Sequence, residues 1–137
     1  MSRNAETLQA LFDAAKAAYD NAYAPYSNFP VGAAILTPEG DIFAGCNVEN
    51  AAYPQGACAE AGAIAAMAVA GRRRIAEILV VGGGEGLCTP CGGCRQRIRE
   101  FAGLDAPIHG AGPQGVRASF TLEELLPQSF GPEHLQI

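Results

Sequence analysis

The sequence is poor in basic residues and contains no long hydrophobic run. Nine lysine and arginine residues stand against fourteen aspartate and glutamate residues, which gives a formal net charge of -5 at pH 7. Proteins that bind long DNA or RNA present a basic face, so this charge balance argues against a nucleic-acid partner. The longest apolar run, residues 61–71, is too short to span a bilayer. We therefore expect neither a nucleic-acid partner nor a membrane partner.

The sequence also lacks an internal repeat, a low-complexity linker and a signal peptide. A charged start at residues 1–4 leads directly into a helical pattern, so we expect a cytoplasmic protein whose five cysteines stay reduced. The glycine-rich run at residues 82–86 lacks the G-x-G-x-x-G order and the lysine of a phosphate-binding loop, and is predicted to be a flexible connection. The 137 residues, 49% of them hydrophobic, are enough for one globular domain, 1–137.

Two short motifs contain three of the cysteines. Cys91 and Cys94 are three residues apart at a predicted helix start, a spacing that places both sulfurs on one helix face. Cys58 begins another predicted helix, and the partial positive charge at a helix N-terminus favours thiolate over thiol. Zinc takes four tetrahedral ligands, and a catalytic site leaves one position for water. The three cysteines are therefore predicted to be zinc ligands.

Glu60 lies two residues after Cys58, a separation that would place its carboxylate near a bound metal without making it a ligand. The order Cys-x-Glu followed by Pro-Cys-x-x-Cys is typical of zinc-dependent nucleobase deaminases, in which zinc activates a water and the glutamate transfers protons. The alternative is a structural zinc knuckle, or a redox Cys-x-x-Cys with an unrelated Cys58. A knuckle needs a fourth protein ligand, for which the candidates are Cys46, Cys88, His109 and His134. That alternative leaves Glu60 and Pro90 unexplained.

Helices and strands are predicted to alternate along the chain. The first helix has a candidate N-cap at Asn4 and apolar residues at helical spacing, namely Leu8, Leu11, Phe12, Ala15 and Tyr19. The other predicted elements are a hairpin of strands 31–37 and 41–48, helix 58–70, strand 75–81, helix 91–101, strands 106–110 and 116–120, and a capping box at 121–124. This alternation implies a layered α/β domain, with a mixed sheet because the hairpin is antiparallel and later strands return through helices.

Two amides and a carboxylate follow the second predicted strand, in the run Cys46-Asn47-Val48-Glu49-Asn50. Strand ends and the loops after them often hold binding sites. Asx-type hydrogen bonds in a polar turn would explain the same composition. The spacing alone leaves both interpretations open.

Several stretches occur in the order typical of one family. They are residues 24–34 (APYSNFPVGAA), 46–51 (CNVENA), 53–54 (YP), 58–60 (CAE), 90–96 (PCGGCRQ), 125–127 (LLP) and 130–132 (FGP). On these residues the chain resembles the short, three-cysteine class of cytidine deaminases over almost its whole length. The resemblance implies a three-layer α-β-α sandwich on a five-stranded mixed sheet, assembled as a homotetramer.

The resemblance also implies roles for individual residues beyond the zinc ligands and the catalytic glutamate named above. Phe29 would pack on the pyrimidine ring. Asn47 and Glu49 would hydrogen-bond the ribose hydroxyls, and the backbone of Ala59 would contact the base. Phe130, near the C-terminus, would reach the site of a neighbouring subunit.

The implied activity is hydrolytic deamination of a free cytidine- or deoxycytidine-like nucleoside to the uridine-like product and ammonia. Glu60 would take a proton from zinc-bound water, and the hydroxide would attack C4. One alternative is a deaminase of another amino-heterocycle or of a modified aminonucleoside. A second, from a different class, is a zinc-bearing domain that binds a ligand or partner without turnover.

One position departs from the family pattern. The family usually has Cys-Ala-Glu-Arg-Thr-Ala, whereas this chain has Ala61 in place of the arginine. That arginine donates hydrogen bonds to the zinc thiolates, and three thiolates on Zn²⁺ leave an uncompensated negative charge. Deaminases of modified cytosine nucleosides, such as the blasticidin S deaminases, also lack it. We predict that Arg95, directly after Cys94, folds back toward the thiolates and replaces part of the missing charge.

Overall fold

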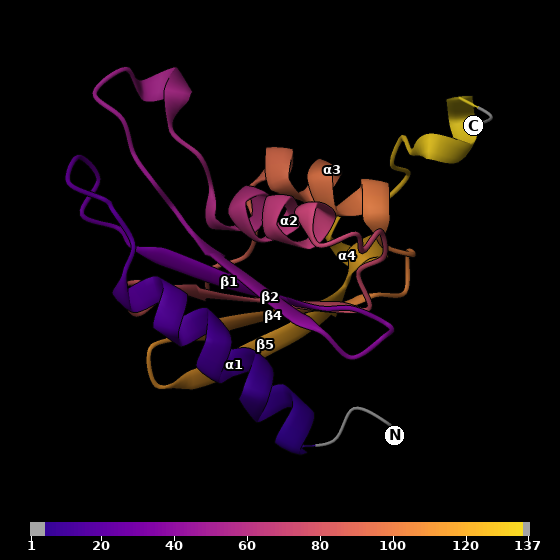
Figure 1. The fold of residues 1–137 in the computed structure, drawn as a ribbon, viewed down its shortest axis with the longest axis horizontal. Coiled ribbons are helices and arrows are strands. Elements are labelled where there is room, and N and C mark those ends of the chain that lie inside the picture. Colours follow the sequence, from indigo (N-terminus) through magenta and orange to yellow (C-terminus); the bar gives the residue numbers. More distant parts are fainter. Residues whose placement is uncertain (1–4, 136–137) are drawn as a thin grey trace.

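The computed structural model describes residues 5–135 and has three layers (Figure 1). A five-stranded sheet forms the middle layer, with helix α1 on one face and helices α2 and α3 on the other. The helices are α1 (Ala5–Asp20), α2 (Ala59–Val69), α3 (Gly92–Phe101) and the short α4 (Leu122–Leu125). The strands are β1 (Val31–Leu36), β2 (Ile42–Cys46), β3 (Glu77–Gly82), β4 (Pro107–Gly112) and β5 (Gly115–Thr121). The predicted α-β-α sandwich is confirmed.

The strand order in the sheet is β2-β1-β3-β4-β5. β1 pairs antiparallel with both β2 and β3, and β4 pairs antiparallel with β5. β3 and β4 are parallel, so they need a crossover connection, which α3 provides. The predicted hairpin and the mixed character of the sheet are therefore confirmed.

The central strand β3 is buried along its whole length because helices cover both faces of the sheet. Ile78 and Val80 belong to the core between the sheet and helices α2 and α3, whereas Leu79 and Val81 pack against α1. This alternation follows the two-residue period of a strand. The prediction began this strand at Ile75, two residues early. Ile75 is buried, but its N–H donates to the carbonyl of Phe101 at 3.0 Å, outside the sheet.

Helix α2 lies close to β2 because the residues between them are small. A Cβ built on Gly45 of β2 would lie only 2.4 Å from the backbone nitrogen of Ala63. A side chain at Gly45 would therefore push the helix away from the sheet. The small residues therefore fix the start of α2, which carries Cys58 and Glu60, relative to the strands.

The helix starts agree with the sequence prediction to within a residue. Cys58 and Cys91 occupy the N-cap positions of α2 and α3. Thr121 and Glu124 form the predicted capping box at the start of α4. The predicted N-cap at Asn4 lies outside the described residues. No helix within residues 5–135 is long and apolar enough to cross a membrane.

Candidate active site

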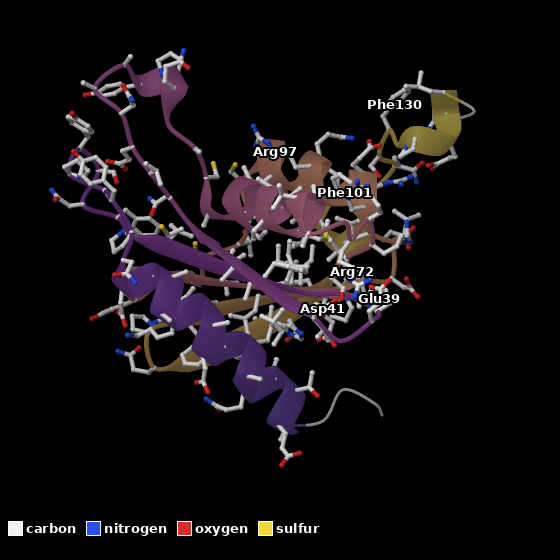
Figure 2. All side chains as sticks on the ribbon, in the orientation of Figure 1. Glu39, Asp41, Arg72, Arg97, Phe101 and Phe130 are labelled. Carbon is white, nitrogen blue, oxygen red and sulfur yellow. The ribbon has the colours of Figure 1, made fainter. Side chains whose placement is uncertain are left out.

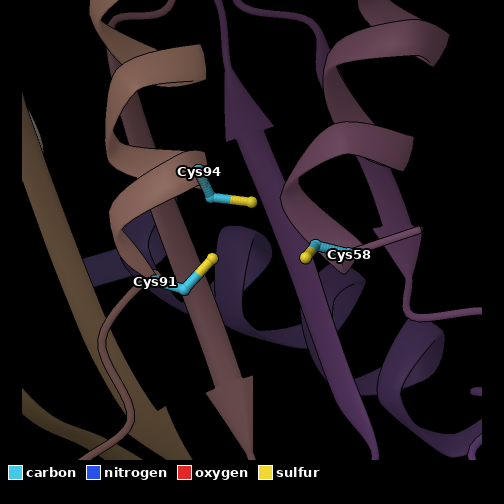
Figure 3. Close-up of side chains that lie close together, drawn as sticks. All are labelled: Cys58, Cys91 and Cys94. Atoms are coloured by element: carbon cyan, nitrogen blue, oxygen red, sulfur yellow. The ribbon is translucent and has the colours of Figure 1, made fainter. Parts of the chain in front are cut away.

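The starts of α2 and α3 bring three cysteine side chains together (Figure 3). Cys58 and Cys91 are the N-caps of the two helices, and Cys94 lies in the first turn of α3. The three sulfurs all lie within 4.8 Å of one another. Within residues 5–135 the cluster includes none of the other candidate ligands, which were Cys46, Cys88, His109 and His134.

Both N-cap sulfurs are free to face the space between the helices. Neither Cys58 nor Cys91 caps its own helix with its side chain. The nearby backbone N–H of Cys94 is the largest influence that lowers the pKa of the Cys91 thiol. Burial raises the pKa of Cys58 and of Cys94. The cluster therefore combines one readily ionised thiol with two that need a compensating cation, which suits a soft divalent metal ion.

The cluster fits zinc in the number, type and spacing of its donors. Zn–S bonds of about 2.3 Å in tetrahedral geometry place sulfurs roughly 4 Å apart. The sulfurs of Cys58, Cys91 and Cys94 already lie within 4.8 Å of one another. Three protein donors leave the fourth tetrahedral position for water or substrate, as in catalytic sites. Because the described residues provide no fourth donor at the cluster, they do not form a closed structural knuckle.

Glu60 lies in the first turn of α2 and is only 4% exposed. Burial raises the pKa of its carboxyl, and a backbone hydrogen bond, Cys94 and Arg97 oppose this shift. The carboxyl faces a cavity of about 200 Å³ whose walls come from several elements. The residues lining it are Phe29, Val31, Asn47, Cys58, Ala59, Glu60, Cys88, Thr89 and Cys91. A buried carboxyl beside the sulfur cluster, yet outside it, is placed to exchange protons with a bound molecule.

The chain matches a known family over most of its length. The sequence model of the family described as the cytidine and deoxycytidylate deaminase zinc-binding region matches residues 5–108. The cytidine deaminase of Sporosarcina psychrophila is 41% identical over 128 residues, which cover 93% of this chain and 94% of that protein. The chain belongs to the cytidine and deoxycytidylate deaminase family.

Solved structures of this family share the fold. The crystal structure of cytidine deaminase from Burkholderia pseudomallei is 46% identical in sequence, has a TM-score of 0.82, and covers 89% of this chain and 98% of that chain. The structure of cytidine deaminase from Mycobacterium leprae is 42% identical, has a TM-score of 0.75, and covers 88% of this chain and 97% of that chain. The resemblance inferred from the sequence motifs is thereby confirmed, and the zinc-binding character of the family agrees with the cysteine cluster.

Asn47 lines the deaminase cavity and fastens the segment that carries Phe29. Its side-chain oxygen accepts a hydrogen bond from the N–H of Val31 at 2.9 Å, and its side-chain nitrogen donates to the carbonyl of Phe29 at 3.0 Å. Phe29 lines the same cavity, as does Ala59 at the start of α2. The structure therefore brings three of the predicted substrate-binding residues to one cavity.

Glu49 lies in a neighbouring pocket of about 340 Å³ rather than in the cavity beside Glu60. Its carboxylate accepts hydrogen bonds from the backbone N–H groups of Tyr26, at 2.9 Å, and Ser27, at 3.1 Å, and from the Ser27 hydroxyl. The hydroxyl contact lowers the pKa of Glu49. These contacts join two distant segments, whereas the Asx-type turn bond that the sequence left open is made by Asn50, whose side-chain oxygen accepts from the N–H of Ala52 at 2.9 Å. Ser27, the partner at their centre, was not identified from the sequence.

Phe130 does not line the cavity of its own chain. Its side chain is 56% exposed and stacks on His134, with ring centroids 5.0 Å apart. Helix α3 holds the surrounding tail: Gln96 donates to the carbonyl of Phe130 at 2.8 Å, and the buried Arg99 donates to Glu133. The tail is thus fixed to α3, and Phe130 lies outside the cavity beside Glu60.

The prediction for Arg95 was wrong. Its guanidinium donates to the carbonyl oxygens of Pro90 and Leu125, both at 2.7 Å, and to the hydroxyl of Thr89 at 2.9 Å. All three guanidinium nitrogens therefore donate to oxygen atoms instead of sulfur. Arg95 fastens the loop that leads into Cys91 to the end of α4.

Arg97, to which the sequence analysis gave no role, contacts the cysteine cluster. Its Nη1 donates to the sulfur of Cys94 at 3.5 Å. Residues three apart share a helix face, so the spacing rule that paired Cys91 with Cys94 also places Arg97 near Cys94. Figure 2 shows Arg97 well separated from Phe130, which lies on the C-terminal tail.

Proposed function

We propose that this chain is a zinc-dependent enzyme that deaminates free cytidine or deoxycytidine to the uridine product and ammonia. The observation that carries the proposal is a buried glutamate in the same small cavity as the cysteine cluster. Glu60 is 4% exposed and lines the cavity together with Cys58 and Cys91. Membership of the deaminase family supports the same reaction.

Cys58, Cys91 and Cys94 would hold the metal. When bound, zinc supplies a Lewis acid that activates a water for attack on the amino-bearing ring carbon. The cysteines come from two helices, so their geometry depends on how α2 and α3 pack. Glu60 lies two residues after Cys58 in the first turn of α2, which sets its carboxylate relative to the metal position within one helical turn.

Glu60 would move the protons of the reaction. Its carboxylate would accept a proton from the attacking water, then deliver protons to the ring nitrogen beside the reacting carbon and to the leaving amine. Its burial keeps bulk water from competing for these transfers. General acid–base catalysis by a positioned group of this kind contributes roughly 10²–10⁴-fold to a rate.

The substrate would be a nucleoside rather than a nucleotide or a polynucleotide. Among the described residues, neither the cavity beside Glu60 nor the pocket beside Glu49 is lined by a lysine or arginine that could pair with a phosphate. The net charge of -5 supports the same preference. Phe29 would pack on the base and the Ala59 backbone would contact it. Asn47 and Glu49 would contact the ribose hydroxyls.

We also propose that the protein is a cytoplasmic homotetramer. Figure 1 shows the segments around residues 22–29 and 47–57 extending beyond one end of the sheet. Tyr26 and Tyr53 lie on these segments with ring centroids 5.8 Å apart, and Tyr53 is 75% exposed. Exposed aromatic groups of this kind are typical of protein interfaces. Phe130 would enter the cavity of a neighbouring subunit. A monomeric mass in light scattering would contradict this assembly.

Ammonia release by the zinc-loaded protein across a panel of amino-bearing substrates tests the activity. The panel comprises cytidine, deoxycytidine, cytosine, cytidine monophosphate, adenosine and blasticidin S. We expect the two pyrimidine nucleosides to react fastest, and zinc-loaded Glu60→Gln to release ammonia at least two orders of magnitude more slowly. A preference for blasticidin S would favour the modified-substrate alternative. Absence of turnover on every compound, with zinc still bound, would favour a binding domain.

A further inference from the structure

The cysteine cluster needs positive charge or hydrogen-bond donors beyond the metal itself. Three thiolates around one divalent cation leave one negative charge uncompensated, and the buried Glu60 lies in the same cavity. Groups that donate hydrogen bonds to metal ligands orient those ligands and tune the metal. The next residue of α2, Ala61, brings neither a charge nor a side-chain donor to the site. A side-chain donor to the thiolates would therefore have to come from another element.

Helix α3 provides one arginine whose guanidinium reaches a cluster sulfur. Nη1 of Arg97 donates to the sulfur of Cys94 at 3.5 Å. Helical side chains lean toward the helix N-terminus, which carries the guanidinium back over the first turn. A Cβ built on Gly93 would lie 3.4 Å from the same Nη1 atom. The guanidinium therefore lies against the turn that presents both Cys91 and Cys94.

The other two arginines of α3 are committed to oxygen acceptors. Arg95 donates to two backbone carbonyls and a hydroxyl, as described above. Arg99 is buried and donates to the side chains of Ser129, at 2.9 Å, and Glu133 in the C-terminal tail. Among the described arginines and lysines, Arg97 alone donates to a cluster sulfur.

We propose that Arg97 is a positioning residue of the metal centre, which compensates thiolate charge by donating a hydrogen bond to Cys94. The donation draws electron density from the sulfur and leaves a bound zinc more electrophilic. Arg97 does not line the cavity beside Glu60, so its hydrogen bond reaches the metal position through Cys94. This inference rests on the metal site of the proposed function, and it does not depend on which substrate is deaminated.

Zinc affinity, measured by competition with a chromophoric chelator, tests the inference without using turnover. We expect Arg97→Gln to weaken zinc binding on the order of tenfold, the lower end of the range for lost partners of metal ligands, because the Arg97 side chain is exposed and its charge is screened by water. Arg97→Lys keeps a charged donor and should recover most of the affinity. Arg74→Gln makes the same charge change at an exposed arginine beyond the end of α2 and should bind zinc as wild type does.

A spectroscopic measurement separates this role from a general effect on folding. In the cadmium-substituted protein, removing a hydrogen bond to Cys94 makes its thiolate a better electron donor. The sulfur-to-cadmium charge-transfer band of Arg97→Gln should therefore shift to longer wavelength, whereas the band of Arg74→Gln should coincide with that of wild type. Ala61→Arg in the Arg97→Gln background places a donor on α2 and should reverse part of the loss in zinc affinity.

Two results would overturn the proposal. One is a zinc affinity of Arg97→Gln within twofold of wild type with an unmoved cadmium band. The other is an equal loss of affinity in Arg97→Gln and Arg74→Gln, which would reflect net charge alone. If Arg97→Gln does not fold, the comparison of Arg97→Lys with wild type decides, because lysine must retain zinc within a few-fold. A protein that binds zinc in this way without deaminating any nucleoside would refute the proposed activity and leave the role of Arg97 intact.

Discussion

The floor and the rim of the candidate site are built differently. The floor consists of two helix starts packed on the sheet, with Cys94 fully buried and Glu60 4% exposed. The rim consists of segments without long helices or strands, in which Tyr53 and Phe130 are more than half exposed. Groups that make and break bonds need fixed geometry, whereas groups that recognise a substrate or a second subunit must be accessible.

Each rim segment is held by hydrogen bonds of its backbone and of a few side chains rather than by a packed core. Asn47 and Glu49 fasten the segment that carries Phe29. Gln96 and Arg99 fasten the C-terminal tail that carries Phe130. Substitutions in the floor should therefore abolish metal binding or chemistry, whereas substitutions in the rim should weaken recognition or local order by smaller amounts.

The largest effect is expected from Cys91→Ala in the floor. Loss of one of three donors should remove zinc and turnover together, and lower the melting temperature of zinc-treated protein because the metal no longer ties α2 to α3. Metal analysis and calorimetry measure both effects. Cys46→Ala, whose sulfur lies outside the cluster, should retain about one zinc per chain. Stoichiometric zinc in Cys91→Ala would show that the ligands are assigned wrongly.

The second-largest effect is expected from Glu60→Gln, which separates proton transfer from metal binding within the floor. Glu60→Gln keeps the size of the side chain and removes its ability to take a proton. The variant should retain zinc, while kcat for cytidine falls on the order of 10² or more. Glu100→Gln makes the same change on the exposed surface of α3 and should leave kcat unaltered. A similar kcat in both variants would exclude Glu60 from proton transfer.

The floor was largely predictable from the sequence. Its groups lie at short, fixed separations within helix starts, so the two-residue step from Cys58 to Glu60 and the three-residue step from Cys91 to Cys94 translate directly into position. For Arg95 and Arg97, in contrast, sequence spacing did not predict which side chain contacts the cysteine cluster. Proximity in the sequence favoured Arg95, but the oxygen acceptors that bind it come from Thr89, Pro90 and Leu125, the last of them thirty residues away.

The rim was less predictable because its contacts join distant residues. The sequence indicated polar groups at Asn47 and Glu49, but not that Ser27 would engage the carboxylate of Glu49, 22 positions away. The C-terminal tail is fixed by Arg99 across 34 positions. The same limit explains the early start of the third predicted strand, because the hydrogen-bond acceptor for Ile75 lies at the end of α3.

An intermediate effect is expected from Asn47→Ala, which tests how the rim recognises substrate. The change leaves the Val31 N–H and the Phe29 carbonyl without their partner, and removes the proposed ribose contact. KM for cytidine should rise on the order of tenfold, roughly one hydrogen bond, with a smaller rise for cytosine. Asn21→Ala, at an exposed asparagine directly after α1 whose side chain donates to the carbonyl of Ala17, should change neither value. An equal rise for nucleoside and free base would mean that Asn47 acts only by placing Phe29.

The smallest effect is expected from Glu133→Gln in the C-terminal tail. Arg99 lowers the pKa of Glu133 by a direct hydrogen bond. A carboxyl whose pKa is lower in the folded protein than in the unfolded chain stabilises the folded state at any pH above the unfolded-chain pKa. This stabilisation is lost as the pH falls through the pKa of the folded protein. The contact between Arg99 and Glu133 should therefore hold the tail at pH 7 and release it in the acid range below the ordinary glutamate pKa.

Hydrogen exchange of residues 127–135 measures this release. At pH 7 the tail of Glu133→Gln should exchange a few-fold faster than that of wild type, while exchange in α1 stays the same. The difference between the two proteins should shrink as the pH falls, because protonation of Glu133 removes the same charge from wild type. Glu85→Gln, at an exposed carboxylate in the glycine-rich loop, provides the matched control. A tail that exchanges identically in Glu133→Gln and wild type at pH 7 would mean that the Gln96 and Ser129 contacts hold it without the ion pair. In that case the tail would be fixed without an acidic side chain, unlike the segment that Glu49 fastens, and it would show no dependence on Glu133 at any pH.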